Sequence, residues 1–231
     1  MCGRFTQERP TSELADIFEA EDLAEGAGGR YNVAPTDEAA VIVQREERRA
    51  VLPFRWGLIP HWAESAKIGN RMFNARAETL ATSPAFRDAF RKRRCLVPVD
   101  SFYEWRREGT VRQPFRIASI DRQPLALAGL WSGWRNPETD EIVRTFTIVT
   151  TTPNELMRSI HDRMPVIIPS EAWDRWLDSA MPDPGALIGL LGPAPDEGIE
   201  AYAVSRAVNT VQNDGPGLID PLPDRERQPG D

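Results

Sequence analysis

A cysteine stands at the second position of this 231-residue chain, in the opening run Met1-Cys2-Gly3-Arg4-Phe5-Thr6. Because the Cys2 side chain is small, an aminopeptidase can remove Met1, which leaves a thiol and a free α-amine on adjacent carbons. The ordinary pKa is ~7.7–8.0 for the amine and ~8.5 for the thiol, so both groups titrate near neutral pH. Such a pair suits an aldehyde, because the amine forms an imine and the thiol then closes a five-membered thiazolidine ring.

Two other uses of Cys2 stay open at this point. Its thiolate, with a pKa lowered by nearby Arg4, can attack a peptide carbonyl with the α-amine as base, as in N-terminal nucleophile hydrolases. If Met1 is retained, Cys2 is an ordinary packing cysteine. The second cysteine, Cys95, lies in an apolar run and is expected in the core. Two cysteines do not make a disulfide framework, which favours a reducing compartment such as the cytosol.

A histidine and a glutamate are candidates for moving protons in either reaction. His161 lies in Ile160-His161-Asp162-Arg163, between a predicted helix and a predicted strand, and histidine both gives and takes protons near neutral pH. Glu104 stands among three aromatic residues in Phe102-Tyr103-Glu104-Trp105. Burial there would raise its pKa and make it a general acid. The alternatives are a structural histidine and a glutamate on the exposed face of a strand.

Asn74-Ala75-Arg76-Ala77-Glu78 supplies two more candidates. In an extended segment Asn74 and Arg76 point the same way, so that an amide can orient a group while a guanidinium holds an anion such as phosphate. The cysteines and the histidines, His61 and His161, show neither CxxC nor HxxxH spacing. We therefore expect no metal site, and none of the candidates calls for an organic cofactor.

These residues need a scaffold of short strands. Residues 13–20 are expected to form a helix capped by Thr11-Ser12, Ser83-Pro84 to start another, and Thr152 to cap a third over 153–160. Further helices are expected after Ser170 and over 184–191. The prediction is an α+β fold with a mixed, mainly antiparallel sheet partly closed into a barrel and flanked by short helices. Strands are predicted at 39–44, 49–54, 95–99, 102–107, 114–119, 125–131, 144–152, 165–169 and 200–205.

Residues 1–212 are predicted to form a single domain, and residues 213–231, rich in Pro, Gly and Asp, a tail that is surface-lying or disordered. The net charge of −7 arises entirely in residues 178–231, which hold ten acidic and three basic side chains. Residues 44–116 instead carry 16 basic and eight acidic groups, densest over 87–94. This excess suits a polyanion, although a solvated helix face is the favoured explanation of such a run. No apolar run reaches the ~18–20 residues of a membrane span, and no signal peptide is seen.

Seven segments in series resemble the SRAP family, the SOS response-associated peptidases, over nearly the whole chain. Each segment alone is a weak signal, and their order along the chain makes the resemblance specific. The segments are MCGRFT (1–6), YNVAPT (31–36), RWGLIPHWA (55–63), NARAET (74–79), CLVPVDSFYEW (95–105), HDRMPVII (161–168) and AVSRAVN (203–209).

The resemblance implies that Met1 is removed and that Cys2 bonds covalently to abasic sites in single-stranded DNA through a thiazolidine. Asn74, Glu104 and His161 resemble the family's active-site groups. The partner implied is single-stranded DNA with abasic sites, in the response to DNA damage. We expect the protein to be a monomer and to act in the bacterial cytosol, associated with the nucleoid.

The resemblance also assigns DNA contacts. Arg4, Arg76 and Arg163 fall on positions that contact phosphates around the lesion, and Trp62 falls in the segment whose bulky side chain stacks on bases. His61 beside Trp62 is a local variation with no assigned role. The alternatives are a thiol peptidase that matures itself or cleaves a partner, a weak lyase acting through the imine, and a non-covalent sensor of damaged single strands.

Overall fold

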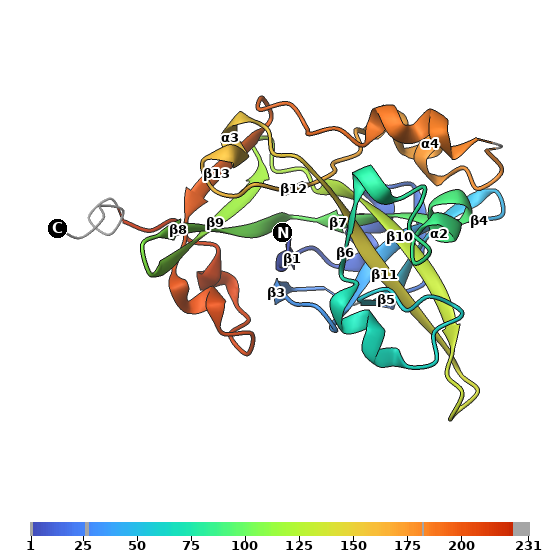
Figure 1. Ribbon diagram of the computed structural model, residues 1–231. Coiled ribbons are helices and arrows are strands. Elements are labelled where there is room, and N and C mark those ends of the chain that lie inside the picture. The colour runs from blue at the N-terminus through green and yellow to red at the C-terminus, as the bar shows by residue number, and fades with distance from the viewer. Residues whose placement is uncertain (1, 26–27, 182, 224–231) are drawn as a thin grey trace.

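The computed structural model describes residues 2–25, 28–181 and 183–223. Five strands form a closed barrel (Figure 1), because β11 pairs with β10 on one side and, in parallel, with β5 on the other. Three short strands extend this sheet, with β2 on β5 and both β6 and β12 on β11. The barrel strands are β4 (Glu38–Arg45), β5 (Arg48–Trp56), β7 (Arg94–Val99), β10 (Leu125–Arg135) and β11 (Ile142–Thr151), and the additions are β2 (Ala20–Asp22), β6 (Asn74–Arg76) and β12 (Met164–Pro165).

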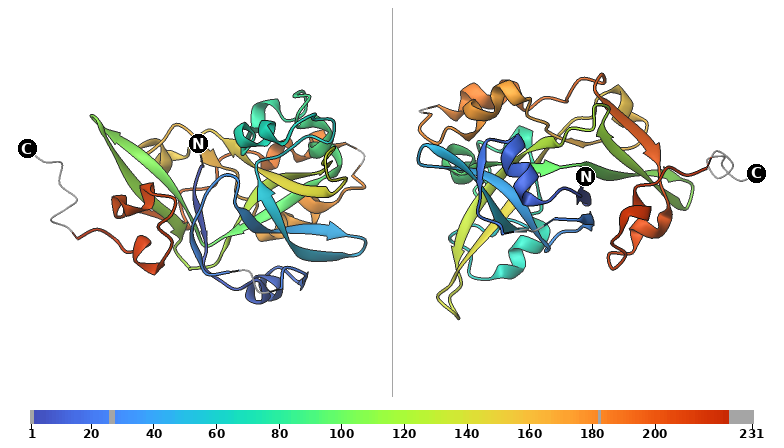
Figure 2. Two further views of the ribbon diagram at one scale, coloured as in Figure 1. Left: turned by 90° about the horizontal axis from the view of Figure 1, so that it is seen from below. Right: turned by 180° about the vertical axis from the view of Figure 1, so that it is seen from behind.

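A second, antiparallel sheet stands beside the barrel. In Figure 2 its outer strands lie toward the C-terminus, at the left of the left view and at the right of the right view. Its order is β13-β9-β8-β1-β3, so the first strand of the chain is an inner strand with a neighbour on each edge. Only Asp100 separates the end of β7 in the barrel from the start of β8 in this sheet. The strands are β1 (Phe5–Gln7), β3 (Arg30–Val33), β8 (Ser101–Glu108), β9 (Val111–Ser119) and β13 (Ile199–Ala203).

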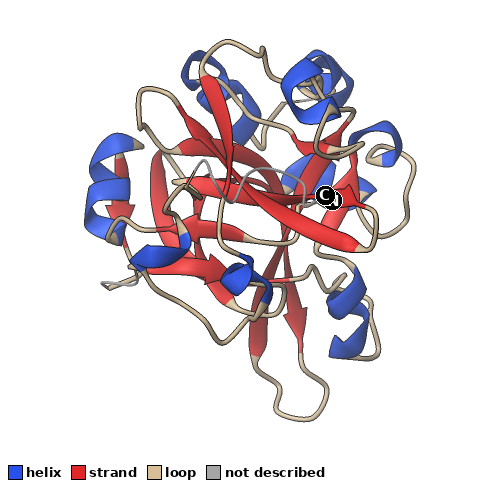
Figure 3. Cartoon of the chain, turned by 90° about the vertical axis from the view of Figure 1, so that its left-hand side faces the viewer, coloured by secondary structure: helices blue, strands red, loops and turns tan. Residues whose placement is uncertain are grey.

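Short helices surround the strands (Figure 3), which confirms the α+β fold and the barrel expected from the sequence. The α-helices are α1 (Thr11–Ile17), α2 (Arg87–Lys92), α3 (Glu155–Arg158) and α4 (Trp173–Leu177). The 3-10 helices are η1 (Ala66–Arg71), η2 (Ala77–Thr79), η3 (Ser170–Ala172), η4 (Pro184–Leu190), η5 (Arg206–Asn209) and η6 (Pro216–Leu218).

Strands β4, β7 and β10 are buried on both faces over most of their lengths, which explains their apolar runs. On β4, Ile42 packs with α1, α2 and α4, while its neighbours Val41 and Val43 pack with the second sheet. Trp56 joins the two sheets at this second cluster, since its ring contacts Phe5 of β1 at 4.8 Å and stacks on Phe146 of β11 at 6.2 Å. The start of the chain is thereby fixed to the barrel two positions after Gly3.

Three helix starts differ from the sequence prediction. Pro10 is the N-cap of α1, and the Thr11 hydroxyl instead donates to Asp22 at 2.8 Å. Helix α3 begins at Glu155 because Asn154, rather than Thr152, accepts from the backbone N–H of Met157. Helix α2 begins at Arg87, after a turn over 84–86. In each case a neighbouring residue provides the cap or the turn, a choice that local spacing does not determine.

The described part of the predicted tail, residues 213–223, packs on the second sheet. Asp214 accepts from the Arg30 side chain at 2.5 Å and from the Tyr31 backbone N–H at 2.6 Å, while Leu218 is buried. Pro221 forms an isolated bridge with Val204. Residues 224–231 of that predicted tail lie outside the described residues. Within the described ranges, no helix is long and apolar enough to cross a membrane.

Candidate active site

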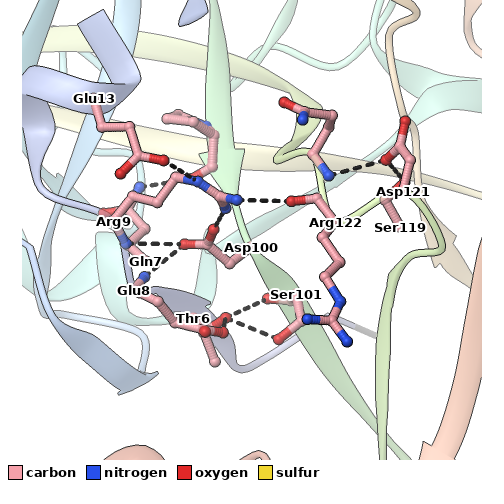
Figure 4. Close-up of polar contacts among 12 residues, drawn as sticks. Thr6, Gln7, Glu8, Arg9, Glu13, Asp100, Ser101, Ser119, Asp121 and Arg122 are labelled. Atoms are coloured by element: carbon pink, nitrogen blue, oxygen red, sulfur yellow. Dashed lines mark hydrogen bonds and ion pairs between the residues drawn. The ribbon is translucent and has the colours of Figure 1, made fainter.

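The segment that leaves β1 toward α1 is held by Asp100, at the junction of the two sheets (Figure 4). The Asp100 carboxylate accepts from the backbone N–H groups of Glu8 at 2.6 Å and of Arg9 at 3.3 Å, and it pairs with the Arg9 guanidinium. The Thr6 and Ser101 hydroxyls lie 2.8 Å apart beside it. These contacts set the register in which Phe5 pairs with Phe102, so residues before Phe5 run alongside those after Phe102.

Cys2 and Asn74 meet across the two sheets. Cys2 is fully buried, and its backbone carbonyl accepts a 2.7 Å hydrogen bond from the Asn74 amide nitrogen. The Asn74 carbonyl oxygen is buried and has no hydrogen-bond partner among the described residues. Burial, followed by the negative charge of Glu104, raises the pKa of the Cys2 thiol, so this thiol stays protonated at neutral pH while Met1 is in place.

Glu104 is buried, which rules out the exposed-strand alternative. Both faces of β8 are covered, because Phe102 packs toward the barrel and Tyr103 packs with Val204 and Val208 on the other face. Burial raises the pKa of Glu104 from its ordinary 4.5 to about 7. Near neutral pH this carboxyl therefore exists in both forms and can either donate or accept a proton.

His161 faces Glu104, with its Nε2 3.9 Å from a Glu104 carboxylate oxygen. Its Nδ1 accepts from the backbone N–H of Arg163 at 3.0 Å and lies 2.9 Å from a carboxylate oxygen of the exposed Asp162. The contact with Arg163 requires a neutral ring, because Nδ1 must then be unprotonated to accept. The contact with Asp162 is a hydrogen bond only when Nδ1 carries a proton. Burial lowers the pKa of His161, which favours the neutral ring. That ring carries its proton on Nε2, directed at Glu104.

Arg163 is engaged within the protein. Its guanidinium makes a two-pronged contact with Glu78, at 2.6 and 3.0 Å, and donates to the Thr150 carbonyl at 2.6 Å. The loop that carries His161 is thereby tied to the segment that carries Asn74. The Glu78 contact was missed from the sequence, although Glu78 stands in the same segment as Asn74 and Arg76, because spacing alone does not show that η2 turns it toward Arg163.

Arg4 lies on the other side of Cys2. One of its guanidinium nitrogens donates to Asn32 and to the Val208 carbonyl, both at 2.7 Å. Its guanidinium carbon lies 6.0 Å from the centre of the Trp105 ring. Burial lowers the pKa of Arg4, which still leaves it protonated at neutral pH. A cation is therefore held two residues from the reactive cysteine.

The remaining predicted residues are exposed. Arg76 ends β6, and the burial of Ala75 between partly exposed Asn74 and exposed Arg76 agrees with the expected alternation. Trp62 is 52% exposed in the turn before η1, and His61 beside it is exposed too. The structure thus brings Cys2, Asn74, Glu104 and His161 together, while Arg76 and Trp62 are exposed.

The densest basic run divides into two parts. Arg94 is buried and donates to the backbone carbonyls of Phe90 and Trp176, so it is part of the packing of α2 and α4. Arg91 and Lys92 are exposed on α2. Arg94 therefore belongs to neither a polyanion site nor a solvated helix face, while Arg91 and Lys92 lie on an exposed helix face that fits both alternatives.

The protein is a five-stranded barrel with a second sheet beside it. The start of the chain lies between the two sheets, where the buried Glu104 carboxyl is close enough to Cys2 to raise the pKa of its thiol. A family model described as SOS response associated peptidase (SRAP) matches residues 1–211, and the chain belongs to this family. Similar proteins are the abasic site processing proteins YoqW of Bacillus subtilis strain 168, 43% identical over 95% of this chain and 99% of the relative, and YedK of Escherichia coli K12, 33% identical over 96% and 100%. A crystal structure of a Bacteroides thetaiotaomicron protein matches with a TM-score of 0.87, 26% identity, 96% of this chain and 100% of the other.

Proposed function

We propose that this chain processes abasic sites by capturing them covalently in single-stranded DNA, inside the cell and in response to DNA damage. The names of its relatives support abasic-site processing, and their similarity extends over nearly the full length of both chains. The observation that carries the covalent step is the grouping of Asn74, Glu104 and His161 around Cys2.

The reaction begins when Met1 has been removed and the α-amine of Cys2 is free. The neutral amine adds to the aldehyde carbon of the open abasic sugar, and loss of the hydroxyl as water gives an imine. The thiol sulfur then bonds to the same carbon while its proton passes to the imine nitrogen, which closes the thiazolidine. In total the aldehyde and the aminothiol combine with release of one water, and no oxidant, metal or cofactor takes part in this balance.

Two features support the amine as first nucleophile. Burial keeps the thiol protonated, which disfavours direct attack by a thiolate. The Asn74 side chain holds the Cys2 carbonyl through its nitrogen, and its buried carbonyl oxygen is then an acceptor that can orient the α-amine.

Glu104 and His161 divide the proton transfers. With a pKa of about 7, protonated Glu104 assists opening of the closed sugar and donates to the departing hydroxyl. His161 accepts at Nδ1, beside the Asp162 carboxylate, the proton that the amine loses on addition, and returns it during ring closure. The Nε2 atom of His161 lies 3.9 Å from the carboxyl of Glu104, so a small movement allows a proton to pass between the two residues.

Cations at the surface would hold the strand. Arg4, two residues after Cys2, and exposed Arg76, two residues after Asn74, are proposed to contact phosphates, with Trp62 stacking on a base. Arg163 is proposed to contribute to the same phosphate field from its pair with Glu78.

The test is the intact mass of the denatured protein after it has met single-stranded DNA with one abasic site. We expect a species that lacks Met1 and carries one DNA strand less one water, stable without a reducing agent. Cys2→Ser should lose this stable adduct, because an oxygen in place of sulfur leaves the imine open to hydrolysis. The same stable adduct from Cys2→Ser would refute the role of the thiol.

The rival activities give different results in the same assay. Strand cleavage by β-elimination from the imine would mark a lyase, and it should persist in Cys2→Ser. Peptide hydrolysis that disappears in Cys2→Ala would mark a thiol peptidase. Binding that salt reverses, and that survives the loss of Cys2, would mark a non-covalent sensor.

A further inference from the structure

An open cleft of 950 Å³ is lined in part by His161. One wall is the outer end of β8, and the other is formed by the segment that leads from β11 through α3 to β12. Its volume is at the upper end of the ~300–1,000 Å³ typical of ligand pockets. The lining residues that bear on its chemistry are Trp105, Arg106, Arg107, Arg158, His161 and Asp162.

The cleft is basic. Three arginines line it, and Asp162 is the one acidic side chain among the lining residues. Arg106 is steadied over the Phe115 ring at 4.6 Å, whereas Arg107 is exposed. Arg158 pairs with Glu155 at 3.1 Å, but both side chains are mostly exposed, and such surface pairs are weak enough for a phosphate to compete.

The cleft is continuous with the candidate active site. His161 lines the cleft and also lies 3.9 Å from the Glu104 carboxyl. Trp105 lines the cleft as well, and its ring lies under the guanidinium of Arg4, two residues after Cys2. His161 and Trp105 therefore connect the cleft to the candidate active site, so a strand bound at Cys2 has a neighbouring basic surface into which it can continue.

We propose that this cleft binds the sugar–phosphate backbone of the strand on one side of the abasic nucleotide, with Arg107 and Arg158 contacting phosphates. Trp105, half-exposed beside them, offers a ring on which the flanking base stacks. A groove that alternates cations with an aromatic ring is the usual arrangement for single strands. This inference rests on the proposed function, because it names the flanking part of the same substrate. A strand has polarity and the cleft lies on one side, so only one flank enters it.

The experiment measures non-covalent binding to single strands that carry tetrahydrofuran, an abasic analogue with no aldehyde. Fluorescent oligonucleotides would extend about five nucleotides from the analogue on the 5′ side, on the 3′ side or on both, within the ~4–16 nucleotides of known single-strand sites. The variant is Arg107→Ala/Arg158→Ala, and the matched control is Arg45→Ala/Arg48→Ala. The control removes the same charge from the exposed β4–β5 hairpin.

We expect wild type and control to gain affinity from both arms. The cleft variant should bind one arm about tenfold more weakly at low salt and keep the gain from the other. Two lost phosphate contacts should also lower the salt slope by about 1.4, at ~0.7 for each contact in a single strand. Equal gains from both arms in the cleft variant, or the same loss in the control, would overturn the proposal.

The two proposals fail separately. Because the analogue cannot be crosslinked, its binding is independent of the chemistry at Cys2. If wild type forms no adduct with a true abasic site but the cleft variant still loses one arm, the covalent step is wrong and the cleft assignment stands. Melting curves of both double variants check the fold, which exposed arginines should leave unchanged.

Discussion

The pH dependence of crosslinking tests the role of Glu104 most sharply. Two groups must be in opposite states, because Glu104 has to be protonated to act as an acid and the Cys2 amine has to be neutral to attack. With a pKa of about 7 for Glu104 and ~7.7 for the amine, each state falls away on one side of neutrality. The rate should therefore pass through a maximum between these two values.

The size of the effect follows from the two fractions. Their product is about 0.1 at pH 7.4, about 0.02 at pH 6 and about 0.01 at pH 9. The rate should thus fall roughly fivefold on the acid side and roughly tenfold on the alkaline side. Glu104→Gln should lower the maximum by ~10²-fold, the lower end for general acid catalysis, and should abolish the alkaline fall.

The assay is the single-turnover rate of adduct formation, followed by denaturing gel from pH 6 to 9. Free cysteine reacting with the same DNA is the control, since it reports the pH dependence of the aldehyde without Glu104. A wild-type rate that still rises at pH 9, or an alkaline fall that persists in Glu104→Gln, would refute a protonated Glu104 as the acid.

Three further predictions concern the supports of the site. Asn74→Ala should slow crosslinking about 10–100-fold while binding of the tetrahydrofuran strand is unchanged, because it removes the contact to the Cys2 carbonyl; weaker binding and an unchanged rate would contradict this. Gly57→Ala should lower the free energy of unfolding by about 2–4 kcal/mol, since Gly57 has a φ of 120° and an added Cβ would lie 2.5 Å from the Gly69 carbonyl. In a denaturant titration Gly109→Ala is its match, with positive φ but open space around it, and should lose only about 1 kcal/mol. Arg163 lowers the pKa of Glu78, so their contact stabilises the fold at pH values above 4.5, the ordinary pKa of glutamate. This stabilisation is lost as the pH falls through the lower pKa that Glu78 has in the folded state. Glu78→Gln should therefore reduce the loss of stability on acidification, and an unchanged dependence of stability on acid pH would show that the pair contributes nothing.

The sequence predicted β4, β7 and β10 of the barrel well because they are apolar runs buried on both faces, and β11 because its residues are β-branched. The ends of helices were harder, since Asn154 and Pro10 compete with Thr152 and Thr11 as caps. No periodicity reveals that β11 reaches back to pair with β5 and close the barrel. That closure depends on residues about 90 positions apart, Arg55 and Thr145 among them.

The candidate site shows the same division. Residue type and order pointed to Cys2, Asn74 and His161, but strand alternation left Glu104 with an exposed alternative. The alternative failed because Glu104 shares its face of β8 with Phe102, which packs in the buried cluster that joins this sheet to the barrel. The cleft arginines were missed, since Arg107 and Arg158 are 51 positions apart and only the packing of α3 beside β8 joins them.

The inner position of β1 also has a consequence for the order of events during synthesis. Strand β1 leaves the ribosome well before its partner β8, which ends at residue 108. At ~5–20 residues per second, about 100 residues take roughly 5–20 s. Throughout that interval β1 lacks its neighbour β8, and an aminopeptidase can act on the first peptide bond of the chain. The late partner therefore provides the time in which Met1 can be removed before the completed fold encloses Cys2.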